Sequence, residues 1–263
     1  MAYKLTWLAD TLLNAGLKVA EVPGWQNRGR AEMGDVLGIL CHHTAGPRDG
    51  NMPSLRTLIE GRSDLQGPLS QLGLGRDGTY YVIAAGRCNH AGSGSWQGLK
   101  DGNSNFIGIE AENTGLGADH WPDVQMDAYR RGAAAILKHI GRPATMCAGH
   151  KEYALPPGRK TDPPFDMDVF RSEVSPILAG TVTQPPLIPA WTPATQVGGI
   201  KNPTLRRNTT GEFVALLQQK LQTDVDGYFG PYTEAAVRAF QKSRALVPDG
   251  IVGPKTWALL DHG

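Results

Sequence analysis

A proline-rich stretch at residues 181–204 divides this sequence into two parts that must fold separately. The stretch holds five prolines and a single charged residue, Lys201, so it can build neither a core nor a regular helix. We expect a semi-extended linker here, between a domain at residues 1–180 and a smaller one at residues 205–263. With 263 residues, the chain is long for one compact domain and comfortable for two.

The charge of both parts is balanced, which argues against a polyanionic partner. Residues 1–180 carry 18 Lys/Arg against 19 Asp/Glu, and residues 205–263 carry 7 against 6. Nucleic-acid binding needs a clear basic excess, so we expect no nucleic-acid partner. The three cysteines are too few and too scattered for a disulfide framework or a four-cysteine zinc site.

The N-terminal residues have the pattern of an amphipathic helix. Apolar side chains recur at Leu5, Leu8, Leu12 and Leu13, and no basic leader precedes a long apolar run. This pattern fits neither a signal peptide nor a membrane span. We therefore expect a protein with no membrane partner that is made and kept in a cytoplasm. Separately, we expect it to be a monomer.

An internal repeat with a spacing of 23 residues organises the C-terminal part. Residues 226–233 (DGYFGPYT) are echoed by residues 249–256 (DGIVGPKT). Each copy combines a glycine turn, an apolar pair, a Gly-Pro step and a threonine placed to cap a following helix. Together with a helical pattern at residues 212–222, the two copies predict a small all-α module of three helices.

The stretch at residues 150–162 (HKEYALPPGRKTD) contains two residues of the kinds that bind metal ions. His150 and Asp162 flank a proline-glycine loop, with Lys160 beside them as a fixed charge. Two such ligands need a third from elsewhere. An apolar strand pattern at residues 36–41 leads to His42 and His43, whose side chains alternate, so at most one of them shares a metal with His150. Ligation and simple packing are about equally good interpretations of this histidine pair.

A second strand pattern, at residues 106–112 (FIGIEAE), carries two carboxylates. Glu110 and Glu112 share one face of the strand, so alternation does not choose between them. Carboxylates on so apolar a strand are costly unless they face a cleft, a metal or a charge, although a solvent-facing edge would also explain them. His90, in a glycine-serine loop, is a weaker candidate, since a loop histidine is usually just solvated.

Four motifs in this order resemble the zinc-dependent N-acetylmuramoyl-L-alanine amidases, the type 2 amidases related to peptidoglycan recognition proteins. The motifs are HHTA from His42, IGIE ending at Glu110, GH ending at His150, and PGRKTD ending at Asp162. The resemblance covers roughly residues 30–170. Residues 205–260 separately resemble a peptidoglycan-binding module. The resemblance implies an α/β domain with a mixed central β-sheet flanked by helices, and peptidoglycan as the partner.

The resemblance also implies roles for the candidate residues. His42, rather than His43, joins His150 and Asp162 as a Zn²⁺ ligand, which leaves a fourth position for water. Glu110, rather than Glu112, is the general base, and Lys160 stabilises the oxyanion.

His90 matches a substrate-contacting position of the family. One departure concerns residues 69–74 (LSQLGL), where some relatives carry a catalytic tyrosine and this chain has none.

These expectations favour a cell-wall lytic enzyme, tethered to its substrate by the C-terminal module. The absence of a signal-peptide pattern favours a phage lysis enzyme that waits in the host cytoplasm until lysis and then acts on the cell wall. Two alternatives remain: a cytoplasmic amidase that recycles soluble wall fragments, and a non-catalytic peptidoglycan receptor. A soluble fragment needs no tether, and receptors of this kind typically lose zinc ligands.

Overall fold

The computed structural model describes residues 3–182, 202–247 and 249–261. The chain divides into two compact units, Met1–Leu187 and Ile188–Gly263. Most of the linker predicted at residues 181–204 lies outside the described residues, so the predicted domain boundaries stay a prediction. In the described part of the chain, no helix combines the length and apolar character needed to cross a bilayer.

The first unit is built on a six-stranded mixed sheet with the order β1-β6-β5-β7-β2-β8. Four neighbouring pairs run parallel, and β5 with β6 runs antiparallel. The strands are β1 (Lys18–Glu21), β2 (Gly38–His43), β5 (Leu72–Leu74), β6 (Thr79–Val82), β7 (Phe106–Ala111) and β8 (Cys147–Gly149). Parallel strands need helical crossovers, which supply the flanking helices. The mixed sheet with flanking helices predicted for this part is therefore confirmed.

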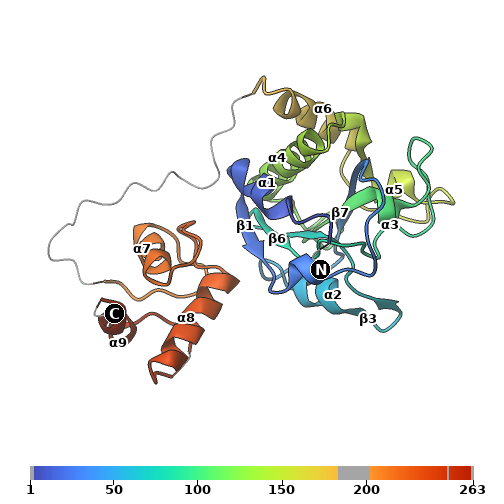
Figure 1. The fold of residues 1–263 in the computed structure, drawn as a ribbon. Coiled ribbons are helices and arrows are strands. Elements are labelled where there is room, and N and C mark those ends of the chain that lie inside the picture. The colour runs from blue at the N-terminus through green and yellow to red at the C-terminus, as the bar shows by residue number, and fades with distance from the viewer. Residues whose placement is uncertain (1–2, 183–201, 248, 262–263) are drawn as a thin grey trace. The chain divides into compact units, whose positions relative to one another are not determined.

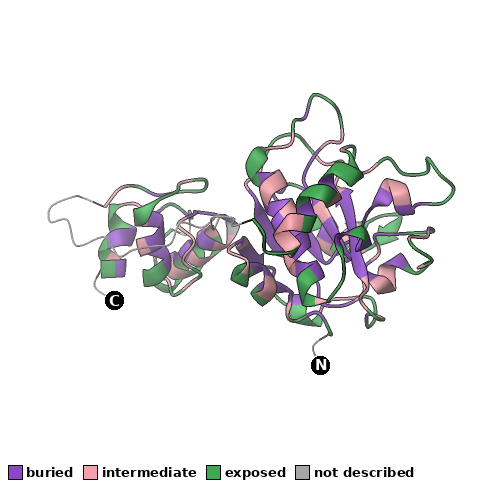
Figure 2. Ribbon diagram, turned by 90° about the horizontal axis from the view of Figure 1, so that it is seen from above, coloured by how far each residue is buried: buried purple, intermediate pink, exposed green. Residues whose placement is uncertain are grey.

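Three helices pack together along the sheet: α1 (Leu8–Asn14), α4 (Asp123–His139) and α6 (Met167–Leu178). Their apolar stripes are buried and their outer faces exposed, as Figure 2 shows. Tyr129 of α4 is buried, and its hydroxyl accepts a hydrogen bond from the His42 amide at 3.0 Å. It also lies 3.0 Å from the Ile109 carbonyl, to which it donates. The long helix thus fastens β2 to β7 at the point where both strands end.

Three shorter helices and a hairpin complete the first unit. The helices are α2 (Leu55–Glu60), α3 (Gly102–Asn105) and α5 (His150–Tyr153), and the hairpin is β3 (Gly61–Arg62) with β4 (Leu65–Gln66). Residues 55–66 thus form a short helix and a hairpin that meet at Gly61. Gly61 has a φ of 93°, a left-handed conformation that ends α2 and starts the hairpin.

The second unit contains α7 (Glu212–Lys220), α8 (Pro231–Ser243) and α9 (Pro254–Asp261) around a separate apolar core. The three predicted helices are present, but the threonines do not cap them. Pro231 and Pro254 occupy the first helical positions, so each helix begins two residues before its threonine. Thr233 and Thr256 are buried inside the first turns.

Two buried glutamines explain where those threonine hydroxyls point. The Gln218 amide nitrogen donates to Thr233 Oγ1 at 2.9 Å and to the Tyr228 carbonyl at 3.0 Å, and its oxygen accepts from the Gly227 amide at 2.8 Å. Gln241 repeats this pattern 23 residues later.

Its amide nitrogen donates to Ile251 O at 2.9 Å and to Thr256 Oγ1 at 3.3 Å, and its oxygen accepts from the Gly250 amide at 2.9 Å. We call each such set a glutamine clamp. The sequence repeat therefore includes Gln218 and Gln241, which its turn motifs alone do not reveal.

Replacing a clamp glutamine should destabilise the second unit. Gln218→Leu keeps the side-chain volume but leaves buried backbone groups without partners, and we expect a loss of about 2–3 kcal/mol in the free energy of unfolding. Gln219→Leu, at an exposed neighbouring position, is the matched control and should change stability little. Urea unfolding followed by circular dichroism measures both, and equal midpoints would contradict the structural role of the clamp.

Candidate metal centre

The pairing of β2 with β7 places His42 directly beside Glu110. The two residues are partners in the parallel register, so their side chains project from the same face of the sheet. His42 Nδ1 lies 3.9 Å from Glu110 Oε1. His42 is almost completely buried, whereas Glu110 is partly exposed. Two strand motifs distant in sequence therefore meet at one end of the sheet.

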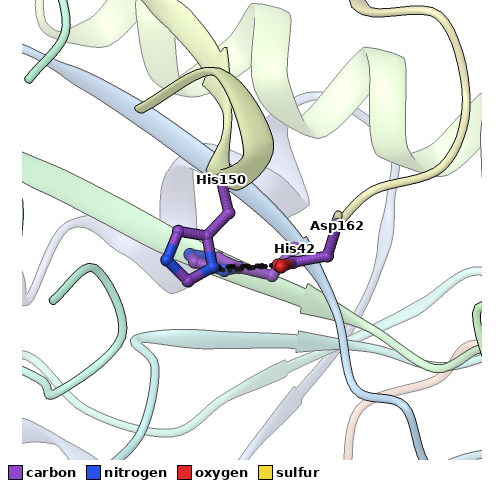
Figure 3. A group of neighbouring side chains, drawn as sticks. All are labelled: His42, His150 and Asp162. Carbon is purple, nitrogen blue, oxygen red and sulfur yellow. Dashed lines mark hydrogen bonds and ion pairs between the residues drawn. The ribbon is translucent and has the colours of Figure 1, made fainter. Parts of the chain in front are cut away.

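The stretch at residues 150–162 brings two further side chains to the same point. His150 is the first residue of α5, directly after β8, and Asp162 lies in the loop that follows α5. His150 Nδ1 is 3.0 Å from His42 Nδ1, and Asp162 Oδ2 is 3.1 Å from His42 Nδ1 and 3.0 Å from His150 Nδ1. Figure 3 shows the three side chains pointing toward one another.

This triangle of atoms fits a metal ion. Two imidazole nitrogens and one carboxylate oxygen form the donor set of a catalytic zinc site, with a fourth position open. A tetrahedral ion with bonds of about 2.0–2.1 Å holds its ligand atoms roughly 3.3–3.4 Å apart, close to the distances here. His150 Nε2 lies 2.9 Å from the Ala91 carbonyl, which only accepts, so Nε2 carries the proton and Nδ1 keeps its lone pair.

The electrostatics of the cluster keep His42 neutral and Asp162 ionised. Burial, followed by the neighbouring His150, lowers the pKa of His42 to about 4. Burial alone would raise the pKa of Asp162, but hydrogen bonds from His150 and His42 outweigh it and hold that pKa well below its ordinary value. Neutral imidazole and ionised carboxylate are the forms that bind metal.

The pKa of Glu110 differs from that of an exposed carboxylate. Burial, and then the Asp162 carboxylate, raise the pKa of Glu110 well above its ordinary value, while Lys160 acts in the opposite direction. A carboxylate with a raised pKa is a better proton acceptor at neutral pH than an unperturbed one. Lys160 is exposed, and it borders the same pocket as Glu110.

Glu112 shares a strand face with Glu110 in the sequence pattern, but the two carboxylates have different environments in the structure. Glu112 is fully buried just beyond the end of β7. Its carboxylate accepts hydrogen bonds from Thr44 Oγ1 at 2.7 Å and from the Ser54 amide and hydroxyl at 3.0 and 2.9 Å. A side chain at Gly46 would collide with it. Glu112 therefore fixes the loop after β2 and does not line the pocket that Glu110 lines.

The remaining predicted residues lie close to the cluster. His43 follows His42 in β2, and its imidazole packs against Gly115 instead of joining the triangle. His90 is 9% exposed and lines the pocket, and its Nδ1 is 3.1 Å from His42 Nε2. The predicted contact of His90 with substrate stays a prediction. Its contact with His42 is a feature that the loop composition did not indicate.

A pocket of about 290 Å³ opens over the cluster. Its walls come from the ends of β2 and β7, from the β3–β4 hairpin, and from the loops that carry His90 and Lys160. Leu69, the first residue of the segment without a tyrosine, lines this pocket. Arg62 and Arg159 also line it, so basic side chains border a site whose centre is carboxylate-rich. Such a pocket is suited to a polar substrate with an amide at the metal site.

Two family models match this chain. Residues 32–164, about half of the chain, match the model described as N-acetylmuramoyl-L-alanine amidase. The chain belongs to the N-acetylmuramoyl-L-alanine amidase family. Residues 210–260 match the model described as a putative peptidoglycan binding domain. Both predicted resemblances are thereby confirmed, and the chain is an amidase whose substrate class is peptidoglycan.

Individual relatives cover the amidase only in part. An uncharacterised protein from Kitasatospora aureofaciens is 46% identical over 82 residues, which is 28% of this chain and 70% of that protein. A zinc D-Ala-D-Ala carboxypeptidase from Streptomyces albus G is 42% identical over 62 residues, 20% of this chain and 24% of that protein. A solved structure of an AmpD derivative is 25% identical, covers 66% of this chain and all of that one, and has a TM-score of 0.48.

The two carboxylates at the end of β7 should respond oppositely to removal of their charge. Glu112→Gln weakens three hydrogen bonds to a buried group, and we expect it to lower the free energy of unfolding by about 1–3 kcal/mol. Glu110→Gln removes a charge that burial disfavours, so at neutral pH it should leave the metal-free protein as stable or more stable. Chemical denaturation in the presence of a chelator compares them. Greater destabilisation by Glu110→Gln would reverse our assignment of their environments.

Proposed function

We propose that this amidase is a zinc-dependent enzyme that cleaves the amide bond between N-acetylmuramic acid and L-alanine, and that it acts as a phage lysis enzyme. The observation that carries the metal proposal is the triangle of His42 Nδ1, His150 Nδ1 and Asp162 Oδ2, with sides of 3.0–3.1 Å. Bound at this triangle, zinc would supply Lewis-acid polarisation of water and of the scissile carbonyl.

The chain's own residues then have distinct tasks. Glu110, beside the triangle and with a raised pKa, accepts the proton of the attacking water and passes it to the leaving amine nitrogen. Lys160 lies on the pocket rim and supplies positive charge for the oxygen that becomes negative in the transition state. His42, His150 and Asp162 would hold the ion, and burial of both imidazoles restrains the positions of their ligating nitrogens.

The peptidoglycan-binding match in the second unit supports action on the intact wall. Holding an enzyme on an insoluble polymer raises the effective concentration of its substrate, whereas a soluble wall fragment needs no such tether. This favours a lytic enzyme over one that recycles soluble fragments. The amidase family and a complete set of candidate ligands favour catalysis over a receptor that only binds.

The chemistry is tested on purified peptidoglycan. We expect the wild-type protein to contain one zinc ion per chain, to release new alanine N-termini, and to lose this activity with a chelator and regain it with zinc. Glu110→Ala should retain zinc and lose about 10²–10⁴-fold in rate, as expected for loss of a general base. His139→Ala, remote from the cluster, is the control.

Two results would contradict this mechanism. Unchanged lysis by Glu110→Ala would remove Glu110 from the reaction. Release of reducing sugar ends in place of alanine N-termini would mean that the bond cleaved is glycosidic.

The lysis role is tested in living bacteria. Cells that express the protein should grow until chloroform permeabilises the inner membrane, and should then lyse within minutes, because the enzyme reaches the wall only after the membrane opens. Cells that express Glu110→Ala should stay intact under the same treatment. Turbidity records both. Lysis without chloroform would contradict an enzyme that waits in the cytoplasm.

A further inference from the structure

One dipeptide, His90–Ala91, contacts the outer nitrogens of both candidate histidine ligands. His90 Nδ1 lies 3.1 Å from His42 Nε2, and the two rings meet edge to face with an interplanar angle of 90°. The Ala91 carbonyl lies 2.9 Å from His150 Nε2. Each ligand histidine thus directs Nδ1 into the triangle, and its Nε2 contacts one residue of this dipeptide.

The hydrogen-bonding roles follow from the chemistry of these groups. A carbonyl only accepts, so His150 Nε2 donates to Ala91 and His150 Nδ1 is left with a lone pair. His42 can bind a metal through Nδ1 only as the tautomer protonated at Nε2. That proton needs an acceptor in a buried site, and the atom within reach is His90 Nδ1.

The dipeptide is itself held by an asparagine. The backbone amides of His90 and Ala91 both donate to Asn103 Oδ1, each at 2.9 Å. Asn103 belongs to α3, and the amide of the preceding Gly102 donates to the Tyr153 hydroxyl at 2.9 Å. Tyr153 ends α5, the helix that begins with His150. The contacts therefore connect the dipeptide to the element that carries a ligand.

Gly108 of β7 makes room for the His90 ring. A Cβ at this position would lie 2.8 Å from His90 Cγ and 2.9 Å from His90 Nδ1, so any side chain would displace the imidazole. Gly108 stands two residues before Glu110 and pairs with Leu40, two residues before His42. The glycine in the IGIE motif thus allows His90 to reach the ligand on the neighbouring strand.

We propose that His90 is a positioning residue for the metal centre, and that Asn103 supports it through the His90–Ala91 backbone. His90 selects the His42 tautomer that binds through Nδ1, and Ala91 does the same for His150. This inference rests on the zinc site of the proposed function. It assigns His90 a role in metal affinity that is separate from the predicted contact with substrate.

Zinc affinity, measured by competition with a chromophoric chelator, tests the proposal without any activity assay. His90→Phe keeps an aromatic ring but removes the acceptor, and we expect zinc affinity to fall by about 10- to 100-fold. His90→Asn restores an acceptor near the Nδ1 position and should recover most of the loss. His139→Phe, at a histidine that stacks on Trp7, is the matched control and should bind zinc as the wild type does.

Asn103 provides a second pair of variants. Asn103→Asp keeps the accepting oxygen and should retain zinc affinity, whereas Asn103→Leu removes it and should lower the affinity. Circular dichroism of the chelator-treated proteins checks that each variant is folded. If His90→Phe does not fold, long-range ¹H–¹⁵N spectra of the wild-type imidazoles decide the question: we expect His42 protonated at Nε2 and His90 unprotonated at Nδ1.

The outcomes separate this inference from the proposed function. Wild-type protein that binds no zinc would overturn both. Wild-type zinc binding together with unchanged affinity in folded His90→Phe, or a proton on His90 Nδ1, would overturn the positioning role alone. A raised KM for peptidoglycan with unchanged zinc affinity would assign His90 to substrate contact instead.

Discussion

The candidate site depends on the register between β2 and β7. Pairing of His42 with Glu110 places a metal-binding nitrogen and a carboxylate on one face of the sheet, and a slip of one residue would send either side chain to the opposite face. The Tyr129 hydroxyl secures this register, since it accepts from the His42 amide and donates to the Ile109 carbonyl. A core residue of α4 thereby controls the geometry of a polar site that it does not line.

Burying the polar groups of this site costs folding free energy. The low pKa of His42 and the raised pKa of Glu110 both reflect side chains removed from water, and Asp162 is held ionised only by its histidine neighbours. Glu112 shows the alternative, because its burial is matched by donors from Thr44 and Ser54. Unmatched polar groups at the end of an otherwise satisfied sheet are typical of functional sites.

Sequence patterns predicted the strands of the site and its motifs because strand alternation and turn chemistry are local. Alternation could not choose between Glu110 and Glu112, because what separates them is their surroundings in the fold: Thr44 and Ser54 donate to Glu112, whereas Glu110 lines the pocket. The family resemblance was needed to favour Glu110. The roles of Asn103 and of the Gln218 and Gln241 clamps were not predicted. Their contacts join segments whose proximity exists only in the folded chain, although the 23-residue spacing of the two glutamines was already present in the sequence.

The glutamine clamps have a consequence for how the second unit opens. Each glutamine sits on one helix and bonds the turn that precedes the next, so Gln218 connects α7 to α8 and Gln241 connects α8 to α9. If α7 or α8 unwinds past its glutamine, the backbone amide in the turn before the next helix loses its hydrogen-bond acceptor. Amide hydrogens throughout the three helices should therefore exchange with solvent together, in a single cooperative opening, despite the small size of the core.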